Sequence, residues 1–350
     1  MRHSLYCILM MYILLSLGCS NKPSVTQTSN HGSNRLYPIE VKKKWGFINN
    51  KGHIVVRPRY DHASIFNDGL LGLVKIGEHS SALVDSKGKT VLTVDGYLAS
   101  DFSEGPALLE STNGELQTHQ YIDEVGNVVI PDQGWDYALG FDEGLALVSY
   151  KKKIGFIDKN GEYAIPPIYD DGSWFSEGLA AIRVGEEWGY IDKHGAIIIT
   201  PRFSRAGDFY EGLACFTFNK TLGLRPSDWG FIDIKGNIVI KNKYVDVQDF
   251  SEGLAPVSII IEAELKWGFI NTQGELVIEP RFDYAYMFRE GLAPVEVGKL
   301  WGYIDKTGKY IVNPTYDSAG YFNNGLALVT EGNISGYIDK NGKYIWKSYK

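Results

Sequence analysis

Short apolar runs separated by glycine-containing turns predict a sheet protein. Residues 292–316 show the pattern most clearly, with apolar runs that predict strands over 292–297, 301–305 and 309–316. Gly308 lies between the last two runs and offers the positive φ that a tight hairpin turn requires. Apolar side chains fall on both faces of such a sheet. Because three strands alone cannot bury two apolar faces, we expect neighbouring sheets to complete the core.

The same pattern recurs nine times between Leu36 and about Tyr349. Its most regular part reads Trp-Gly-[Phe/Tyr]-Ile-[Asp/Asn], and complete copies begin at Trp45, Trp188, Trp229, Trp267 and Trp301. Only the tail of this motif survives at 83–85, 121–123, 154–158 and 335–339. A Phe-x-x-Gly element closes all eight junctions, at Phe66, Phe102, Phe141, Phe175, Phe209, Phe250, Phe288 and Phe322. Self-similarity at a fixed period is typical of repeat architectures.

These motifs resemble the WG-repeat family, also called KWG repeats, which occurs in many bacterial envelope proteins. The resemblance covers nearly all of the chain from Leu36 to about Tyr349. It implies an all-β repeat scaffold, often on exported lipoproteins, whose molecular function is mostly undefined. Repeats two, three, four and nine lack the Trp, so this feature does not carry over to them.

The repeat predicts a tandem array of nine three-stranded antiparallel units. A minimal repeat takes 34 residues, whereas propeller blades usually have four strands in about 40 residues. Nine repeats also exceed the four to eight blades of most propellers. We therefore expect an open β-solenoid or superhelix, with a closed β-propeller-like ring as the alternative.

The first residues predict export and lipid attachment. Arg2 precedes an apolar run over 5–17, which is too short to span a membrane and is typical of a signal peptide. The run ends in Leu-Ser-Leu-Gly-Cys-Ser at 15–20, which resembles a lipobox and implies an acylated Cys19. The predicted organisation is a lipoprotein signal peptide over 1–18, the acylated Cys and a flexible tether over 19–35, and the repeat array over 36–349.

Composition and charge restrict the class of partner. The chain has 350 residues, of which 44% are hydrophobic and 22% charged, as in folded proteins. Its formal net charge is −7, and its longest basic runs are three lysines, whereas a nucleic-acid binder needs a basic face. We expect no nucleic-acid partner. The expected partners are the membrane, through the lipid on Cys19, and an envelope protein or glycan.

Catalytic and metal-binding patterns are not evident. The acids before the junction glycines recur from repeat to repeat, which argues for a turn rather than for one asymmetric active site: Glu104, Glu143, Glu177, Glu211, Glu252 and Glu290. The seven histidines form no His-x-x-x-His pair. Asp158-Lys159-Asn160-Gly161 begins like a calcium loop but recurs as the hairpin turn. We expect no enzyme activity, cofactor, catalytic residue or metal site.

Length variation points to one edge of the array. The interval from the Trp position to the next Leu position is 25 residues in seven of eight cases. Almost all variation falls in the first hairpin of each repeat, with the longest insertions at 218–228, 259–266 and 110–118. Either these exposed turns have drifted, or they form an edge that contacts a partner.

The leading hypothesis is a non-catalytic lipoprotein of the bacterial cell envelope, facing the periplasm or the exterior, that serves as a repeat scaffold for protein binding. A module that binds carbohydrate or cell-wall glycan is the alternative. The sequence names no ligand-binding residue.

Overall fold

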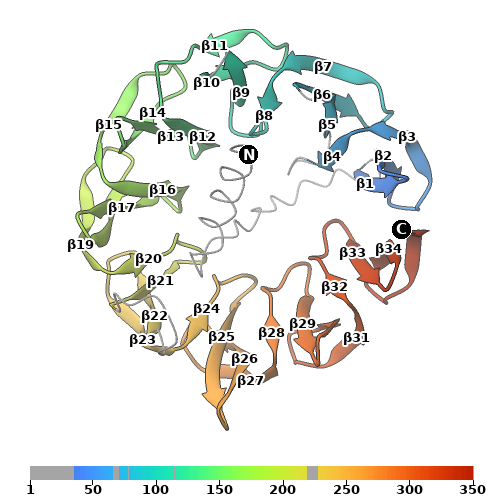
Figure 1. Ribbon diagram of the computed structural model, residues 1–350. Helices are drawn as coiled ribbons and strands as arrows, with labels where there is room; N and C mark the ends of the chain where they lie inside the picture. Colours follow the sequence, from blue (N-terminus) through green and yellow to red (C-terminus); the bar gives the residue numbers. More distant parts are fainter. Residues whose placement is uncertain (1–34, 66–70, 78, 114–115, 219–227, 350) are drawn as a thin grey trace, which may run out of the picture. The chain divides into compact units, whose positions relative to one another are not determined.

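A computed structural model describes residues 35–65, 71–77, 79–113, 116–218 and 228–349. These residues form 35 strands and no helix, arranged as nine antiparallel sheets that we number 1 to 9 in chain order (Figure 1). The strands of each sheet pair in chain order. Apolar runs punctuated by glycine turns thus form strands, as the sequence predicts.

The described chain divides into two compact units. Compact unit one comprises Phe175–Asp192 and Ala196–Thr315 and holds most of sheets 5 to 8. Its strands are β16 (Asp171–Ser176), β17 (Leu179–Val184), β18 (Glu187–Asp192) and β19 (Ile197–Phe203) in sheet 5, β20 (Arg205–Ala206), β21 (Leu213–Thr217), β22 (Trp229–Asp233) and β23 (Ile238–Tyr244) in sheet 6, β24 (Asp246–Val247), β25 (Leu254–Ile261), β26 (Glu264–Asn271) and β27 (Leu276–Phe282) in sheet 7, and β28 (Tyr284–Ala285), β29 (Ala293–Val297), β30 (Leu300–Ile304) and β31 (Tyr310–Tyr316) in sheet 8.

Compact unit two comprises residues 35–174, 193–195 and 316–349 and holds the other five sheets. Its strands are β1 (Leu36–Val41), β2 (Lys44–Asn49) and β3 (Ile54–Tyr60) in sheet 1, β4 (His62–Ile65), β5 (Leu71–Ile76), β6 (Ser80–Asp85) and β7 (Thr90–Asp95) in sheet 2, β8 (Tyr97–Leu98), β9 (Ala107–Asn113), β10 (Leu116–Ile122) and β11 (Val128–Ile130) in sheet 3, β12 (Tyr137–Asp142), β13 (Leu145–Tyr150), β14 (Lys153–Ile157) and β15 (Tyr163–Tyr169) in sheet 4, and β32 (Ser318–Ala319), β33 (Leu326–Glu331), β34 (Ile334–Asp339) and β35 (Tyr344–Tyr349) in sheet 9.

The three predicted strands of each repeat are present, but eight of the nine sheets contain a fourth. The additional strand is the first of its sheet and is only two residues long in sheets 3, 6, 7, 8 and 9. In sheet 8 it is β28, which pairs with β29 through Tyr284↔Glu296 and Ala285↔Val295. The prediction of three-stranded units is therefore wrong except for sheet 1. Two residues are too few to show the alternation by which a strand is recognised in a sequence.

The first and last sheets pack against each other within compact unit two. The hydroxyl of Tyr37 donates to the carbonyl of Asn324 at 2.8 Å, and that of Tyr337 donates to the carbonyl of Pro38 at 2.9 Å. The two tyrosine rings meet edge to face, with centroids 5.4 Å apart. Figure 1 shows β1 and β2 beside β33 and β34. The expectation of an open superhelix is wrong, because the apolar faces of the terminal sheets are buried on one another. The propeller-like alternative is correct, and the sheets are its blades.

Six of the seven junction Phe side chains that the structure describes, those from Phe141 to Phe322, are buried in the core. Phe250 packs on Phe231, and Phe288 packs on Phe269, each with ring centroids 4.9 Å apart. All four side chains are at most 1% exposed. The aromatic residue of the Trp-Gly-[Phe/Tyr] motif in one sheet thus meets the Phe-x-x-Gly element that lies between the first and second strands of the next sheet. This contact explains why both elements recur with the same period.

The Gly of the Trp-Gly motif is required by a close backbone approach. A β-carbon on Gly268 would lie 2.5 Å from the carbonyl oxygen of Ile278, and the other glycines at this position meet the same obstacle at 2.3 to 2.7 Å: Gly46, Gly155, Gly189, Gly230, Gly302 and Gly336. In sheet 7 the register between the third strand, β26, and the fourth strand, β27, shifts at this point. In sheet 2 the Gly is replaced by Ala82, which pairs with Thr93 in a stretch without a bulge.

Candidate functional site

Several predicted features lie outside the described residues. They include Cys19, the signal peptide over 1–18 and the tether except for Arg35. Of the insertion at 218–228, only Phe218 and Asp228 are described, and the insertion at 110–118 lacks residues 114 and 115. The insertion at 259–266 is described completely.

The acids before the junction glycines form turns, as predicted. Glu177, Glu211 and Glu252 have φ between 53° and 56°, the left-handed backbone of a tight turn. The Glu177 carboxylate accepts a hydrogen bond from the backbone N–H of Gly212, 2.8 Å away in the next sheet. Glu211 accepts from Gly253 in the same way, at 2.9 Å. These carboxylates join consecutive sheets within compact unit one.

Asp158 belongs to an ordinary hairpin turn. Its Oδ1 atom accepts hydrogen bonds from the backbone N–H groups of Asn160 and Glu162, at 2.9 and 3.0 Å. These bonds favour the charged carboxylate and hold the pKa of Asp158 below its usual range. The same bonding recurs at Asp85, Asp233, Asp305 and Asp339.

The motif tryptophans line the interfaces between sheets. Trp267 and Trp229 are 1% and 5% exposed, and Trp45, Trp188 and Trp301 are half-buried. Trp267 covers Tyr284 in the first strand of the following sheet, with ring centroids 4.9 Å apart. Trp45 covers His62 in the equivalent place at 5.1 Å. None of the five motif tryptophans, all of which are described, offers an exposed ring.

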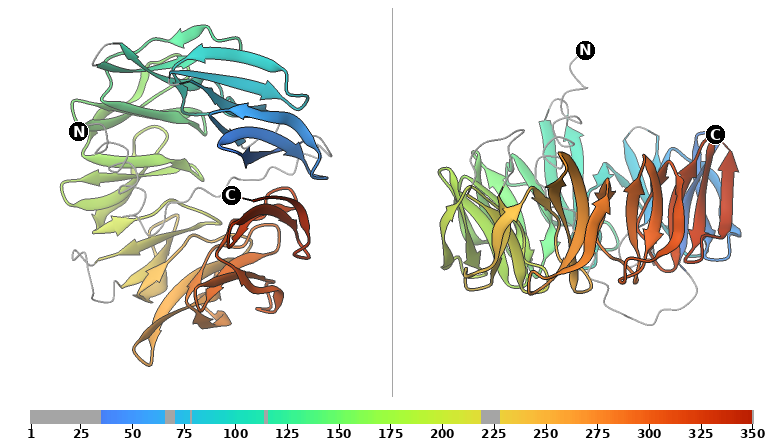
Figure 2. Two further views of the ribbon diagram at one scale, coloured as in Figure 1. Left: turned by 45° about the vertical axis from the view of Figure 1, so that its right-hand side comes forward. Right: turned by 90° about the horizontal axis from the view of Figure 1, so that it is seen from below.

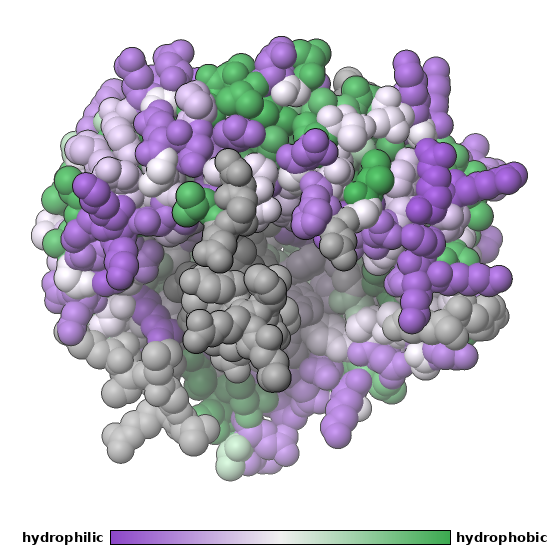
Figure 3. All heavy atoms as spheres, turned by 45° about the horizontal axis from the view of Figure 1, so that its top comes forward, coloured by the Kyte–Doolittle hydropathy of each residue, from purple (hydrophilic) through white to green (hydrophobic). Residues whose placement is uncertain are grey.

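The hairpins between the second and third strands of sheets 5 to 8, which are the first hairpins of their repeats, carry exposed apolar side chains at their tips. We call these residues of compact unit one, each 36% to 55% exposed, the tip surface: Val184, Phe218, Ile260, Ile261, Leu265, Val297 and Leu300. The hairpin of β25 and β26 contributes most, because its strands are eight residues long and pair up to Ile261↔Glu264. Figure 2 shows this hairpin reaching beyond its neighbours in the same unit. The face drawn in Figure 3 has hydrophobic residues in separate groups among hydrophilic ones.

Acidic groups accompany the tip surface. Glu262 and Ala263 form the turn of the long hairpin, both with positive φ. Lys266 is paired with Glu264 at 2.7 Å and with Asp283 at 2.8 Å. One lysine thus faces two carboxylates, and Glu262 adds a third acid at the tip. The run Ile259-Ile260-Ile261 marks this hairpin in the sequence, but its exposure depends on how far the strands extend.

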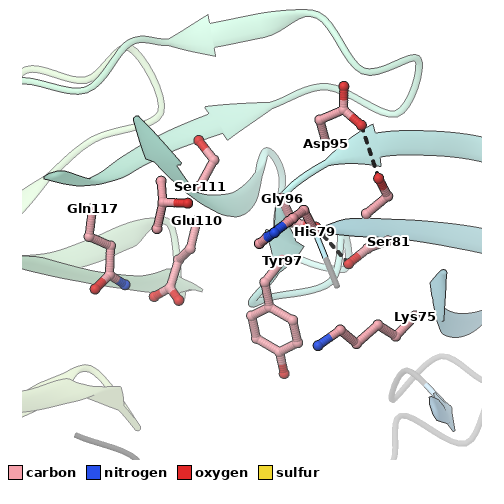
Figure 4. Close-up of a pocket in the computed structure, with 11 residues that line it drawn as sticks. Lys75, His79, Ser81, Asp95, Gly96, Tyr97, Glu110, Ser111 and Gln117 are labelled. Atoms are coloured by element: carbon pink, nitrogen blue, oxygen red, sulfur yellow. Dashed lines mark hydrogen bonds between the residues drawn. The ribbon is translucent and has the colours of Figure 1, made fainter. Parts of the chain in front are cut away.

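A second candidate site is a hollow of ≈ 750 Å³ between sheets 2 and 3, in compact unit two. We call it the Tyr97 hollow. Figure 4 shows the side chains of Lys75, Tyr97, Glu110 and Gln117 pointing into the same open space. Asp95, Ser81 and Ser111 also line it. None of these residues was predicted from the sequence to bind a ligand. The loss of Trp from repeats two and three was the sequence feature that could have indicated this hollow.

Strand register shows where the missing tryptophans belong. Trp301 pairs with Glu296 in sheet 8, and His119 pairs with Glu110 in sheet 3, so His119 takes the Trp place. Trp188 pairs with Arg183 in sheet 5, and Ser81 pairs with Lys75 in the same way in sheet 2. The Ser81 hydroxyl donates to the carbonyl of Gly96 at 2.8 Å.

Burial changes the chemistry of Glu110. This side chain is partly enclosed, and desolvation raises its pKa, while the nearby His119 lowers it. The His119 Nε2 atom lies 4.0 Å from the Glu110 carboxylate. The other ring nitrogen of His119 is buried without a hydrogen-bond partner. The hollow thus has a partly buried carboxyl on one wall and the exposed Lys75 on another.

We expect Asp246 to make the stability of compact unit one depend on pH. Burial raises the pKa of Asp246 to about 6, opposed by the hydrogen bond from the Val247 N–H. An unfolded Asp titrates near 3.9, so between about pH 4 and pH 6 the folded chain holds the proton more tightly, and stability falls as pH rises through this window. We expect Asp246→Asn to remove about 3 kcal/mol of this loss, an order-of-magnitude value. Urea unfolding at pH 3 and pH 7, on either side of this window, measures it.

Asp249, which is 3% exposed, has its pKa raised by burial and by Asp208, so some pH dependence should remain in Asp246→Asn. Glu262→Gln, at the exposed hairpin turn, is the control. An Asp246→Asn protein with the same change in stability between the two pH values as the wild type would contradict the assignment.

Among the residues that the structure describes, no three His, Cys, Asp or Glu side chains are grouped as a metal ion would require. Within the same residues, no helix is long and apolar enough to cross a membrane.

Four-stranded antiparallel sheets and packed terminal sheets define an all-β repeat protein of the propeller type. The chain belongs to the WG-containing repeat family, whose model matches more than half of its length. The matched segments are residues 45–78, 121–153, 154–188, 188–221, 229–259, 267–301 and 301–333. No curated protein matches the chain.

Several solved structures resemble this chain at low sequence identity and with TM-scores below 0.5. BamB from Moraxella catarrhalis is 10% identical, covers 89% of this chain and 98% of its own, and superposes with a TM-score of 0.47. The uncharacterized protein lmo1340 from Listeria monocytogenes is 11% identical, with 72% and 93% covered and a TM-score of 0.41. Hsv2 from Kluyveromyces lactis is 10% identical, with 82% and 96% covered and a TM-score of 0.37. At such values the likeness carries no argument about function.

Proposed function

We propose that this protein is a non-catalytic, lipid-anchored scaffold of the bacterial cell envelope that binds a protein partner through the tip surface. The observation that carries the proposal is the set of exposed apolar side chains at the first hairpins of sheets 5 to 8. These are the hairpins in which the repeats differ in length, whereas the rest of the repeat is nearly constant. Exposed apolar side chains grouped in one region are typical of surfaces that bind other proteins.

The chemistry of the tip surface indicates the kind of partner. Apolar side chains such as Ile260 and Leu265 would be buried at the centre of the contact, and acids such as Glu262 would lie at its rim. A complementary partner presents an apolar patch with basic side chains around it. The conformation of the hairpin is held by its strand pairing, so little ordering is needed on binding.

The non-catalytic part of the proposal rests on how the recurring polar groups are used. The junction acids bind backbone N–H groups of the following sheet, and the hairpin Asp residues bind those of their own turn. Both sets have the period of the repeat, which is what a structural role requires. The envelope location and the lipid anchor rest on the pattern of residues 1–20.

We expect the triple variant Ile260→Ser, Ile261→Ser, Leu265→Ser to lose its partner. Immobilised wild-type protein is used to capture proteins from detergent-solubilised envelopes, and captured proteins are quantified by mass spectrometry. The proposed partner should fall by at least about tenfold with the variant, because each apolar contact contributes on the order of 1 kcal/mol. The melting temperature should hardly change, because the three side chains are largely exposed already.

The matched control is Ile197→Ser, Ile198→Ser, Val239→Ser. These side chains are 44% to 54% exposed and lie on β19 and β23, the fourth strands of two sheets in the same compact unit. They lie near the ends of β18 and β22 that are farthest from the hairpin tips, since Ile197 pairs with Ile191 and Ile238 pairs with Ile232. The control variant should still capture every protein that the wild type captures. If the tip variant captured the partner as well as the wild type, neutral drift, and not partner binding, would explain the variable hairpin lengths. Shortening the hairpin at 259–266 to the minimal length gives an independent test, because shortening a hairpin loop costs little entropy.

A further inference from the structure

The Tyr97 hollow occupies a place that other repeats fill with an indole ring. Trp267 of sheet 7 packs on Tyr284 of sheet 8. Tyr97 is the counterpart of Tyr284, because each pairs with a glutamate of the second strand, Glu110 and Glu296 respectively. In sheet 2 the residue at the Trp position is Ser81. Nothing of indole size therefore covers Tyr97, which is 56% exposed, whereas Tyr284 is half-buried.

The polar groups around the exposed ring limit what can bind. Asp95 and Glu110 provide carboxyl oxygens, Gln117 provides an amide with donors and an acceptor, and Lys75 provides an ammonium group. The two carboxyl groups and Lys75 give the hollow charges of both signs, which suits a neutral ligand with donors and acceptors better than one that carries several charges of one sign. A wholly apolar ligand would leave these groups without partners, which costs free energy. The remaining class is a neutral molecule with many hydroxyl groups and one apolar face.

We propose that the Tyr97 hollow binds a neutral oligosaccharide, with one sugar ring packed on Tyr97 and its hydroxyls bonded to Glu110 and Gln117. A sugar ring has an apolar face of C–H groups and a rim of hydroxyls, which matches an exposed aromatic ring surrounded by donors and acceptors. The volume of ≈ 750 Å³ falls within the range of about 300–1,000 Å³ that is usual for small-molecule sites. This site lies in compact unit two, whereas the tip surface lies in compact unit one, so the inference is independent of the proposed protein partner.

Isothermal titration calorimetry and saturation-transfer NMR test the proposal with neutral trisaccharides of glucose, galactose, mannose and N-acetylglucosamine. We expect the wild type to bind at least one of them at millimolar concentration or below. Tyr97→Ala should weaken this binding by about fivefold, since an aromatic contact of this kind contributes about 1 kcal/mol. Glu110→Gln should weaken it less, because an amide keeps one acceptor oxygen.

Tyr137→Ala is the matched control. Tyr137 holds the corresponding place in sheet 4, where Ala138 pairs with Val148 as Leu98 pairs with Leu109, and it does not line the hollow. The Tyr137→Ala variant should bind the same sugar with the same affinity as the wild type. Ser81→Trp restores the motif residue and should block the hollow, with folding checked by circular dichroism.

The proposal is overturned if the folded wild type binds none of the four trisaccharides, or if Tyr97→Ala binds as tightly as the wild type. Tighter binding of sialic acid or glucosamine than of the neutral sugars would also overturn it, because the hollow would then select for charge. The tip-surface variant should bind the sugar normally, so failure here and failure of the protein-partner proposal are distinguishable.

Discussion

Trp267→Ala is expected to lower the free energy of unfolding by about 3–5 kcal/mol, as truncation of a buried aromatic side chain does elsewhere. The side chain is 1% exposed and packs on Tyr284 of the next sheet. Its removal leaves a cavity between two sheets and deprives both of contact area. Urea unfolding followed by circular dichroism measures the loss.

Two further variants separate the causes of this loss. The indole N–H of Trp267 is buried without a hydrogen-bond partner, so Trp267→Phe loses ring volume but no hydrogen bond and should cost much less than alanine. Trp301→Ala should also cost less, because this ring is half-buried. A loss below about 1 kcal/mol for Trp267→Ala would mean that the indole is not part of a tightly packed interface.

Cys19→Ala is expected to abolish lipid attachment completely. Cells that express the protein are labelled with a palmitate analogue, and the label on the purified protein is measured together with its distribution between membrane and soluble fractions. The wild type should be labelled and sediment with membranes, because each buried methylene of an acyl chain contributes about 0.8 kcal/mol to binding. Without the thiol no chain can be attached, so the variant should leave the membrane fraction.

Cys7→Ala is the control, since this residue lies within the predicted signal peptide and should be absent from the mature chain. It should be labelled like the wild type. Persistent membrane anchoring of Cys19→Ala would contradict the lipoprotein assignment, whatever the outcome for the binding surfaces.

The positions of most strands could be predicted from the sequence because they depend on the local pattern of apolar and turn residues. In sheet 8 the predicted strands 292–297, 301–305 and 309–316 correspond to Ala293–Val297, Leu300–Ile304 and Tyr310–Tyr316. The hairpin glycines and the junction glutamates were readable for the same reason, since a positive φ is a property of a few consecutive residues. The two-residue strand Tyr284–Ala285 was missed because it exists only through its pairing with β29.

The candidate sites depend on more than local pattern. The variable first hairpins were visible as differences in interval, and the sequence therefore indicated the edge on which the tip surface lies. It did not show that Ile260 and Leu265 remain exposed, because this depends on how far the neighbouring hairpins extend. The Tyr97 hollow was not predicted, although the replacement of Trp by Ser81 was visible. A missing side chain leaves a space only if the adjacent sheet does not move in to fill it.

The sequence by itself determined the class of the protein, the number of repeats and the place of most strands, because each repeat contains its own apolar runs, turns and aromatic contacts. Only the tertiary structure decided between an open superhelix and a propeller. The contacts that decide it join residues about 300 positions apart, such as Tyr37 and Tyr337, and no short-range pattern specifies that such residues meet. Closure depends instead on the accumulated angle between successive sheets, which is set by the packing of every interface and not by any one repeat.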